Sequence, residues 1–176
     1  MKKLFAAFFY IMILLIIVSF AMGASFVLPY PWSKVNILFA FLLLILAFRP
    51  QGTVVWMSFI AHFFLELYAI TPFGILLVSG TLSMLFTFWA YQYLFSNRSW
   101  YAMVAMCAFT LGIYRCIYVI TLYIAHLIHP ETVISWGSIM ETTAWEILFT
   151  TTLVAVLYLI FFYRSRRPVI MSMYGR

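Results

Sequence analysis

The stretch AHFFLELYAITPFG, residues 61–74, contains a carboxylate, Glu66, within a run of Phe, Leu and Ile side chains. His62 precedes Glu66 by about one helical turn, and Pro72 and Gly74 mark a turn directly after it. A charged side chain at the centre of a membrane-spanning helix costs about 2.5–3.5 kcal/mol on insertion scales, so it normally has a partner or a function. The hydrophobic segments around this stretch determine where Glu66 lies.

The composition is that of an integral membrane protein. Of the 176 residues, 67% are hydrophobic and 8% are charged, and the mean hydropathy is +1.11. Soluble domains are about 45–50% apolar and about 25% charged. The sequence therefore predicts a single transmembrane domain over residues 1–176, without room for a separate soluble domain.

Six apolar runs predict an all-α bundle of six transmembrane helices. The first run is longer than the roughly 7–15 apolar residues of a signal peptide, so we expect it to be retained as a span. The second run, with fourteen residues, is short of the roughly twenty that a span needs. The expected spans cover residues of about 4–22, 35–48, 53–70, 75–95, 101–128 and 144–163.

The positions of Lys and Arg indicate the topology. With the N-terminus inside, Lys2, Lys3, Arg49, Arg98 and four arginines of the C-terminal tail face the cytoplasm, whereas only Lys34 faces outward. This distribution follows the positive-inside rule and predicts that both termini are cytoplasmic. Because the basic residues stand at the ends of apolar runs, the net charge of +6 does not indicate nucleic-acid binding.

A second buried charge, Arg115, lies inside the fifth expected span. Counting at 1.5 Å per residue places Glu66 and Arg115 in the outer half of a membrane core about 30 Å thick. A cluster of Glu66, His62 and Arg115 inside the bundle is consistent with these depths. The first interpretation is an ion pair that locks the third span to the fifth, and the alternative is a ligand or partner site.

Other polar residues give weaker signals. Glu141 and Glu146 lie five residues apart, on different faces of a helix, and we interpret them as carboxylates near the N-terminus of the last span that favour its dipole. His126 and His129 lack a third metal ligand. The sequence has no phosphate loop, CxxC pair or Ser–His arrangement, so we expect no catalytic residue, cofactor or metal.

Four features together carry a family resemblance. They are Lys34-Val35-Asn36 after a Pro-rich outer loop, the turn Arg49-Pro50-Gln51-Gly52, the pair Glu66-Leu67 seven residues before Gly74, and the connection Leu94 to Arg98. With a basic tail, this layout resembles the bacterial rod-shape-determining MreD family from about Leu28 to Tyr163. The chain departs from the family in having Glu66 where an Asp is usual, and Arg115 has no place in the family pattern.

The resemblance implies a non-enzymatic scaffold in the inner membrane of a bacterium. Its partners would be the lipid bilayer, an MreC-like protein, the elongation synthase and transpeptidase, and the actin-like MreB filament. The bundle interior would be filled, and Glu66 would be paired or would cap the turn after it. The family is similar in fold to substrate-binding S-components of energy-coupling-factor vitamin transporters. That alternative predicts an outward cavity lined by Glu66, Tyr68, Trp56 and Arg115. A subunit of another large membrane complex is a third alternative.

Overall fold

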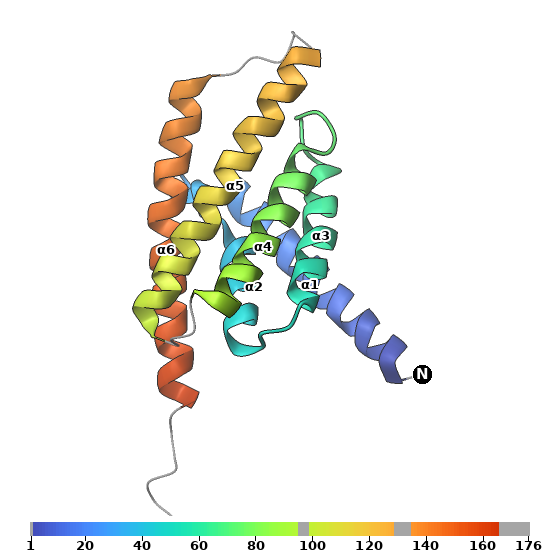
Figure 1. Cartoon of the computed structure of the whole chain (residues 1–176), viewed down its shortest axis with the longest axis vertical. Coiled ribbons are helices and arrows are strands. Elements are labelled where there is room, and N and C mark those ends of the chain that lie inside the picture. The colour runs from blue at the N-terminus through green and yellow to red at the C-terminus, as the bar shows by residue number, and fades with distance from the viewer. Residues whose placement is uncertain (1, 95–98, 129–134, 166–176) are drawn as a thin grey trace, which may run out of the picture.

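The computed structural model describes residues 2–94, 99–128 and 135–165, and the side chains of 11–94, 99–128 and 135–161. Over these residues the protein is an all-α bundle of six helices with one short 3-10 helix, η1 (Figure 1). The elements are α1 (Lys2–Val27), η1 (Trp32–Lys34), α2 (Ile37–Phe48), α3 (Thr53–Glu66), α4 (Ile75–Tyr93), α5 (Trp100–Ile128) and α6 (Trp136–Ser165). Arg98, His129 and the tail arginines at 166, 167 and 176 lie outside the described residues, as do the side chains of Lys2, Lys3 and Arg164.

Three helices are long and apolar enough to cross a membrane: α4 over Ile75–Tyr93, α5 over Trp100–Ile128 and α6 over Trp136–Phe161. They indicate a multi-pass membrane protein. The helices α2 and α3 have 12 and 14 residues, which corresponds to lengths of about 18 Å and 21 Å. Both are shorter than the roughly 30 Å hydrocarbon core, so neither crosses it as a straight helix perpendicular to the bilayer.

Three of the predicted boundaries were wrong by a helical turn or more. The first helix ends at Val27 and not near residue 22. The third helix ends at Glu66 and not near residue 70, because residues 67–69 form turns and the residue before Pro72 is disfavoured in a helix. The last helix begins at Trp136 and not near residue 144. Its polar first turns contact the segment between α1 and α2, where the Tyr30 hydroxyl donates to Glu141 Oε1.

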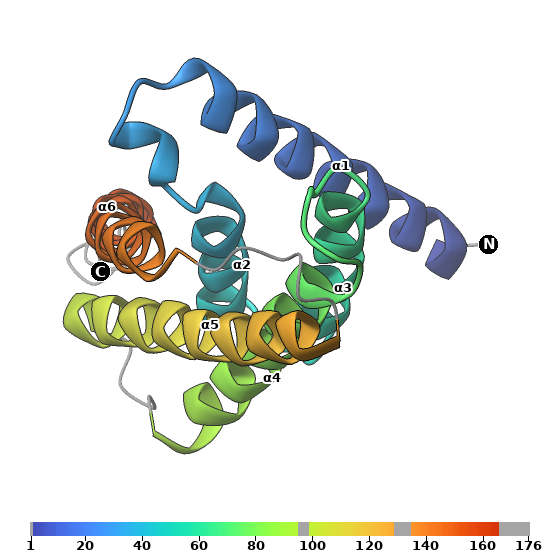
Figure 2. The ribbon, with the colours of Figure 1, turned by 90° about the horizontal axis from the view of Figure 1, so that it is seen from above.

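The short helix α2 is the centre of the core. Nine of its twelve residues are buried, and Phe39, Leu43 and Leu46 have no exposed surface. Viewed from above, α1, α3, α5 and α6 surround it (Figure 2), and each of them contacts it. A helix that is apolar on all sides is stable where other helices cover it. This explains why α2, the shortest of the six helices, lies at the centre of the bundle.

Small residues let α4 pack closely between α3 and α5. The buried positions Ser79, Gly80, Ser83 and Thr87 recur at helical spacing along one side of α4. Their hydroxyls are satisfied, since Ser83 Oγ donates to the Gly80 carbonyl at 2.9 Å and Thr87 Oγ1 lies 2.9 Å from Thr110 Oγ1 of α5. Small and hydroxylated residues are typical of helix contacts within membranes.

Candidate functional site

Glu66 caps the N-terminus of α4 from the end of α3. Its Oε1 accepts a hydrogen bond from the Gly74 amide at 3.0 Å, and its Oε2 accepts one from the Leu77 amide at 2.6 Å. The first amides of a helix have no partner within the helix, and a negative charge there is favourable. Gly74, with φ of 102°, provides the left-handed backbone but no capping side chain. A carboxylate eight residues earlier in the chain therefore takes that role.

His62 is a packing residue where four helices meet. It is 2% exposed, and its Nδ1 lies 2.8 Å from the Ser58 carbonyl, to which it donates. Its ring faces Gly80 of α4 so closely that a Cβ atom at Gly80 would lie 2.1 Å from the ring. The rings of Phe39 from α2 and Tyr114 from α5 lie 5.2 Å and 6.3 Å from it, measured between centroids. The His62 side chain of α3 thus fills the space between α2, α4 and α5.

Arg115 pairs with Glu146 and not with Glu66. The Arg115 Nε donates to Glu146 Oε2 at 2.5 Å, and a second guanidinium nitrogen contacts the same oxygen. The interpretation of Glu146 as a residue near the start of the last helix was wrong, because α6 begins ten residues earlier and Glu146 is 3% exposed. The expected cluster is therefore divided: Glu66 and His62 stabilise the α3–α4 pair, and Arg115 joins α5 to α6.

Asn36 connects this ion pair to α2. Its Nδ2 donates to Glu146 Oε1 at 2.7 Å, and its Oδ1 accepts a hydrogen bond from the Phe39 amide at 3.1 Å as the N-cap of α2. Its own amide donates to Thr150 Oγ1 of α6 at 2.9 Å. Sequence reasoning missed this role, although an Asn directly before a twelve-residue apolar run is an N-cap signal.

The segment between α1 and α2 also contacts α6. The Tyr30 hydroxyl donates to Glu141 Oε1, and the Trp32 and Phe149 rings lie 4.5 Å apart. The hydrogen bond to Glu141, with a smaller contribution from desolvation, raises the pKa of Tyr30 above its ordinary value of 10.0. These contacts hold the segment between α1 and α2 against the last helix.

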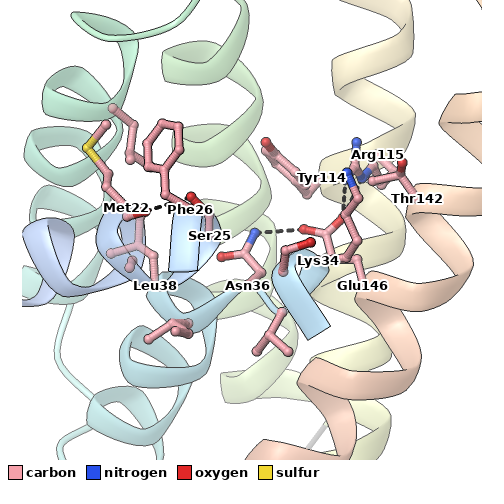
Figure 3. A pocket seen from close by; sticks show the side chains of 15 residues that line it. Met22, Ser25, Phe26, Lys34, Asn36, Leu38, Tyr114, Arg115, Thr142 and Glu146 are labelled. Atoms are coloured by element: carbon pink, nitrogen blue, oxygen red, sulfur yellow. Dashed lines mark hydrogen bonds and ion pairs between the residues drawn. The ribbon is translucent and has the colours of Figure 1, made fainter. Parts of the chain in front are cut away.

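A cavity of about 350 Å³ lies above the N-terminus of α2. Figure 3 shows side chains of α1, including Met22, Ser25 and Phe26, on one side of it, and Arg115 and Glu146 on the other. Ser33, Lys34, Asn36 and Thr142 also line it. Of the four residues that the alternative expectation placed in a cavity wall, Arg115 lines this cavity, whereas Glu66, Tyr68 and Trp56 do not. Tyr68 and Trp56 are 72% and 70% exposed on the outside of the bundle.

Within the described part of the chain, no three potential metal ligands lie together. Cys107 is buried in the core, whereas Cys116 is exposed. The polar side chains inside the bundle thus form a helix cap, a packed histidine and an ion-pair network beside a cavity.

Comparison with known proteins gives no relative from which a function could be transferred: no family model, curated protein or solved structure matches this chain.

Proposed function

We propose that this protein is a non-enzymatic scaffold subunit of a bacterial cell-elongation complex, as the resemblance to the MreD family implies. In this proposal all six helices are embedded in the inner membrane: α1, α2 and α3 are membrane spans in addition to α4, α5 and α6. Both termini are cytoplasmic. The observation that carries the proposal is an apolar groove along α2, between α1 and α6.

The groove consists of two adjoining hollows of about 650 Å³ and 430 Å³. Phe41 lines both hollows and is 36% exposed, although α2 is otherwise largely buried. The other walls come mainly from α6, with smaller contributions from α1 and from the segment between α1 and α2. Helices α1 and α6 lie on two sides of α2 (Figure 2). The polar groups among the side chains of the lining residues are the Thr152 hydroxyl, the Trp32 indole N–H and, at the end near the turn after α2, the Arg49 guanidinium.

An apolar helix of a partner membrane protein fits this groove. The groove follows most of α2, a length of about 18 Å at 1.5 Å per residue. A partner helix laid along it would cover the one side of the central helix that its own bundle leaves open. The described connections between helices are short, so a partner would be recognised through helix faces such as this one, through the short loops or through the basic tail. An MreC-like protein or the elongation synthase is the expected partner.

Photo-crosslinking in living cells tests this proposal. A photoreactive phenylalanine analogue at Phe41 should give a covalent adduct with a membrane protein of the elongation machinery, identified by mass spectrometry. The matched control is Phe86, which is 49% exposed on α4, away from the groove. Adducts to lipid alone at Phe41, or the same protein adduct at both positions, would contradict the proposal. A partner from another complex would favour the third alternative.

A solute-binding transporter subunit, similar to an S-component, is the second candidate function. The observation that favours it is the 350 Å³ cavity with Arg115 in its wall. Co-purification in mild detergent separates the two candidates, because a transporter subunit should bring an ATPase pair with it and a scaffold should bring elongation proteins.

A further inference from the structure

We propose that the cavity above α2 binds an anionic group, a carboxylate or phosphate, that pairs with Lys34 and Arg115. The ligand is either a small organic anion from the outer aqueous phase or the phosphate of an anionic lipid headgroup. This inference does not depend on the scaffold proposal, since it concerns a ligand of the polar cavity and not the partner of the apolar groove.

The cavity exists because α2 is shorter than its neighbours. Asn36, directly before α2, contacts Glu146, so the end of α2 lies at the level of the Arg115–Glu146 pair. From that level α5 continues thirteen residues to Ile128, and α6 has begun ten residues earlier at Trp136. At 1.5 Å per residue, these helices extend about 20 Å and 15 Å past the end of α2. Figure 1 shows both rising above α2.

The charges that line the cavity leave it positive. Lys34 and Arg115 are cationic and Glu146 is the single carboxylate among the lining residues, so the net charge is +1. Both oxygens of Glu146 are occupied, one by Asn36 and one by Arg115. Within the described residues the Lys34 ammonium has no ion-pair partner, and the residue is only half-buried. The cavity therefore offers a cation that the protein itself leaves unneutralised.

Hydrogen-bond donors also remain for a ligand. A guanidinium has five N–H groups, and the contacts to Glu146 use its Nε and one terminal nitrogen. The Arg115 side chain is 17% exposed and lies at the cavity wall (Figure 3). The hydroxyls of Ser33 and Thr142 are close by in the same lining. Carboxylates and phosphates are the groups that such charged donors bind most strongly.

The size of the cavity limits the ligand. A volume of about 350 Å³ is at the lower end of the range for small-molecule sites. Phe26 and Met22 of α1 provide an apolar side opposite the charged residues (Figure 3). The ligand is therefore a compact anion or a single headgroup, with at most a small apolar part against α1.

Thermal unfolding of the full-length protein in phosphatidylcholine nanodiscs tests the inference. One arm adds inorganic phosphate or acetate against equal concentrations of chloride, and the other replaces part of the phosphatidylcholine with phosphatidylglycerol. A ligand that binds only the folded state raises Tm with concentration. We expect one arm to raise Tm. In Lys34→Gln, about tenfold more ligand should be needed for the same rise in Tm, because one charged contact is lost.

Lys3→Gln is the matched control. It makes the same charge change near the start of α1, whereas the cavity is lined by residues near the end of α1. It should keep the wild-type response. A response to phosphate or acetate alone identifies a soluble anion, and one to phosphatidylglycerol alone identifies a lipid headgroup. The inference is overturned if neither arm raises Tm, or if Lys3→Gln weakens the response as much as Lys34→Gln. The scaffold proposal stands or falls separately, on the crosslinks at Phe41.

Discussion

Gly80 of α4 has no room for a side chain, because the His62 ring of α3 occupies the space where a Cβ atom would stand. The ring cannot easily move away, since its Nδ1 donates to the Ser58 carbonyl at 2.8 Å and its faces meet neighbouring aromatic rings. We expect Gly80→Ala to destabilise the protein by about 1–3 kcal/mol, the usual cost of overpacking a core. Thermal or denaturant unfolding in detergent measures this loss.

Gly112 provides the control for that substitution. It lies within α5, and a Cβ atom there would meet nothing within 4 Å. Gly112→Ala should be neutral or stabilising by up to about 1 kcal/mol, because alanine favours a helix over glycine. Equal effects at the two positions would show that His62 does not restrict Gly80.

A double-mutant cycle distinguishes the partner of Arg115. Arg115→Gln combined with Glu146→Gln should show a coupling free energy of about 0.5–3 kcal/mol, as expected for groups in contact. Arg115→Gln combined with Glu66→Gln should be additive within about 0.5 kcal/mol, because Glu66 instead accepts hydrogen bonds from the Gly74 and Leu77 amides. The free energies of unfolding of the single and double variants provide both values. Coupling to Glu66 as large as that to Glu146 would restore the pair expected from the sequence.

At the scale of elements, α2 depends on Asn36 both for its cap and for its connection to α6. These two roles can be separated. Asn36→Ala removes both, and the lost cap alone costs about 0.5–2 kcal/mol. Asn36→Asp retains a good N-cap but replaces the amide donor to Glu146 with a second carboxylate.

We therefore expect Asn36→Asp to be at least as destabilising as Asn36→Ala, although Asp and Asn are equally good caps in isolated helices. Unfolding of the two variants in the same detergent, compared with the wild type, measures the difference. If Asn36→Asp were as stable as the wild type, the cap would be the whole contribution of this residue and the contact with Glu146 would contribute nothing.

At the scale of the whole molecule, the proposed topology places the turn after α2 inside the cell and the turn after α3 outside. Both turns have exposed residues, Gln51 and Phe73, where a single cysteine can be introduced. In a variant with Cys107 and Cys116 replaced by alanine, Phe73→Cys should react with a membrane-impermeant maleimide on intact spheroplasts. Gln51→Cys should react only after permeabilisation. Labelling of both from outside, or the reverse pattern, would contradict the proposed topology.

The sequence predicted a helical membrane bundle and placed most helix boundaries within two or three residues. Hydrophobicity and turn residues are local properties, and both can be read along the chain. The end of α1, the end of α3 and the start of α6 were missed, and the last two depend in part on tertiary contacts. Glu66 turns toward the start of α4, and the polar first turns of α6 are held by contacts such as that between Tyr30 and Glu141.

The sequence by itself determined that the protein is an all-α bundle with helices apolar enough to cross a membrane, and it singled out Glu66 as a charge that needs a partner. Only the tertiary structure decided which carboxylate meets Arg115, and that the short α2 is the central helix with a cavity above it. The physical reason is distance along the chain: Arg115 and Glu146 are 31 residues apart, and Asn36 and Glu146 are 110 apart. No local pattern specifies such pairs, because they form only when the packing of apolar faces brings the helices together.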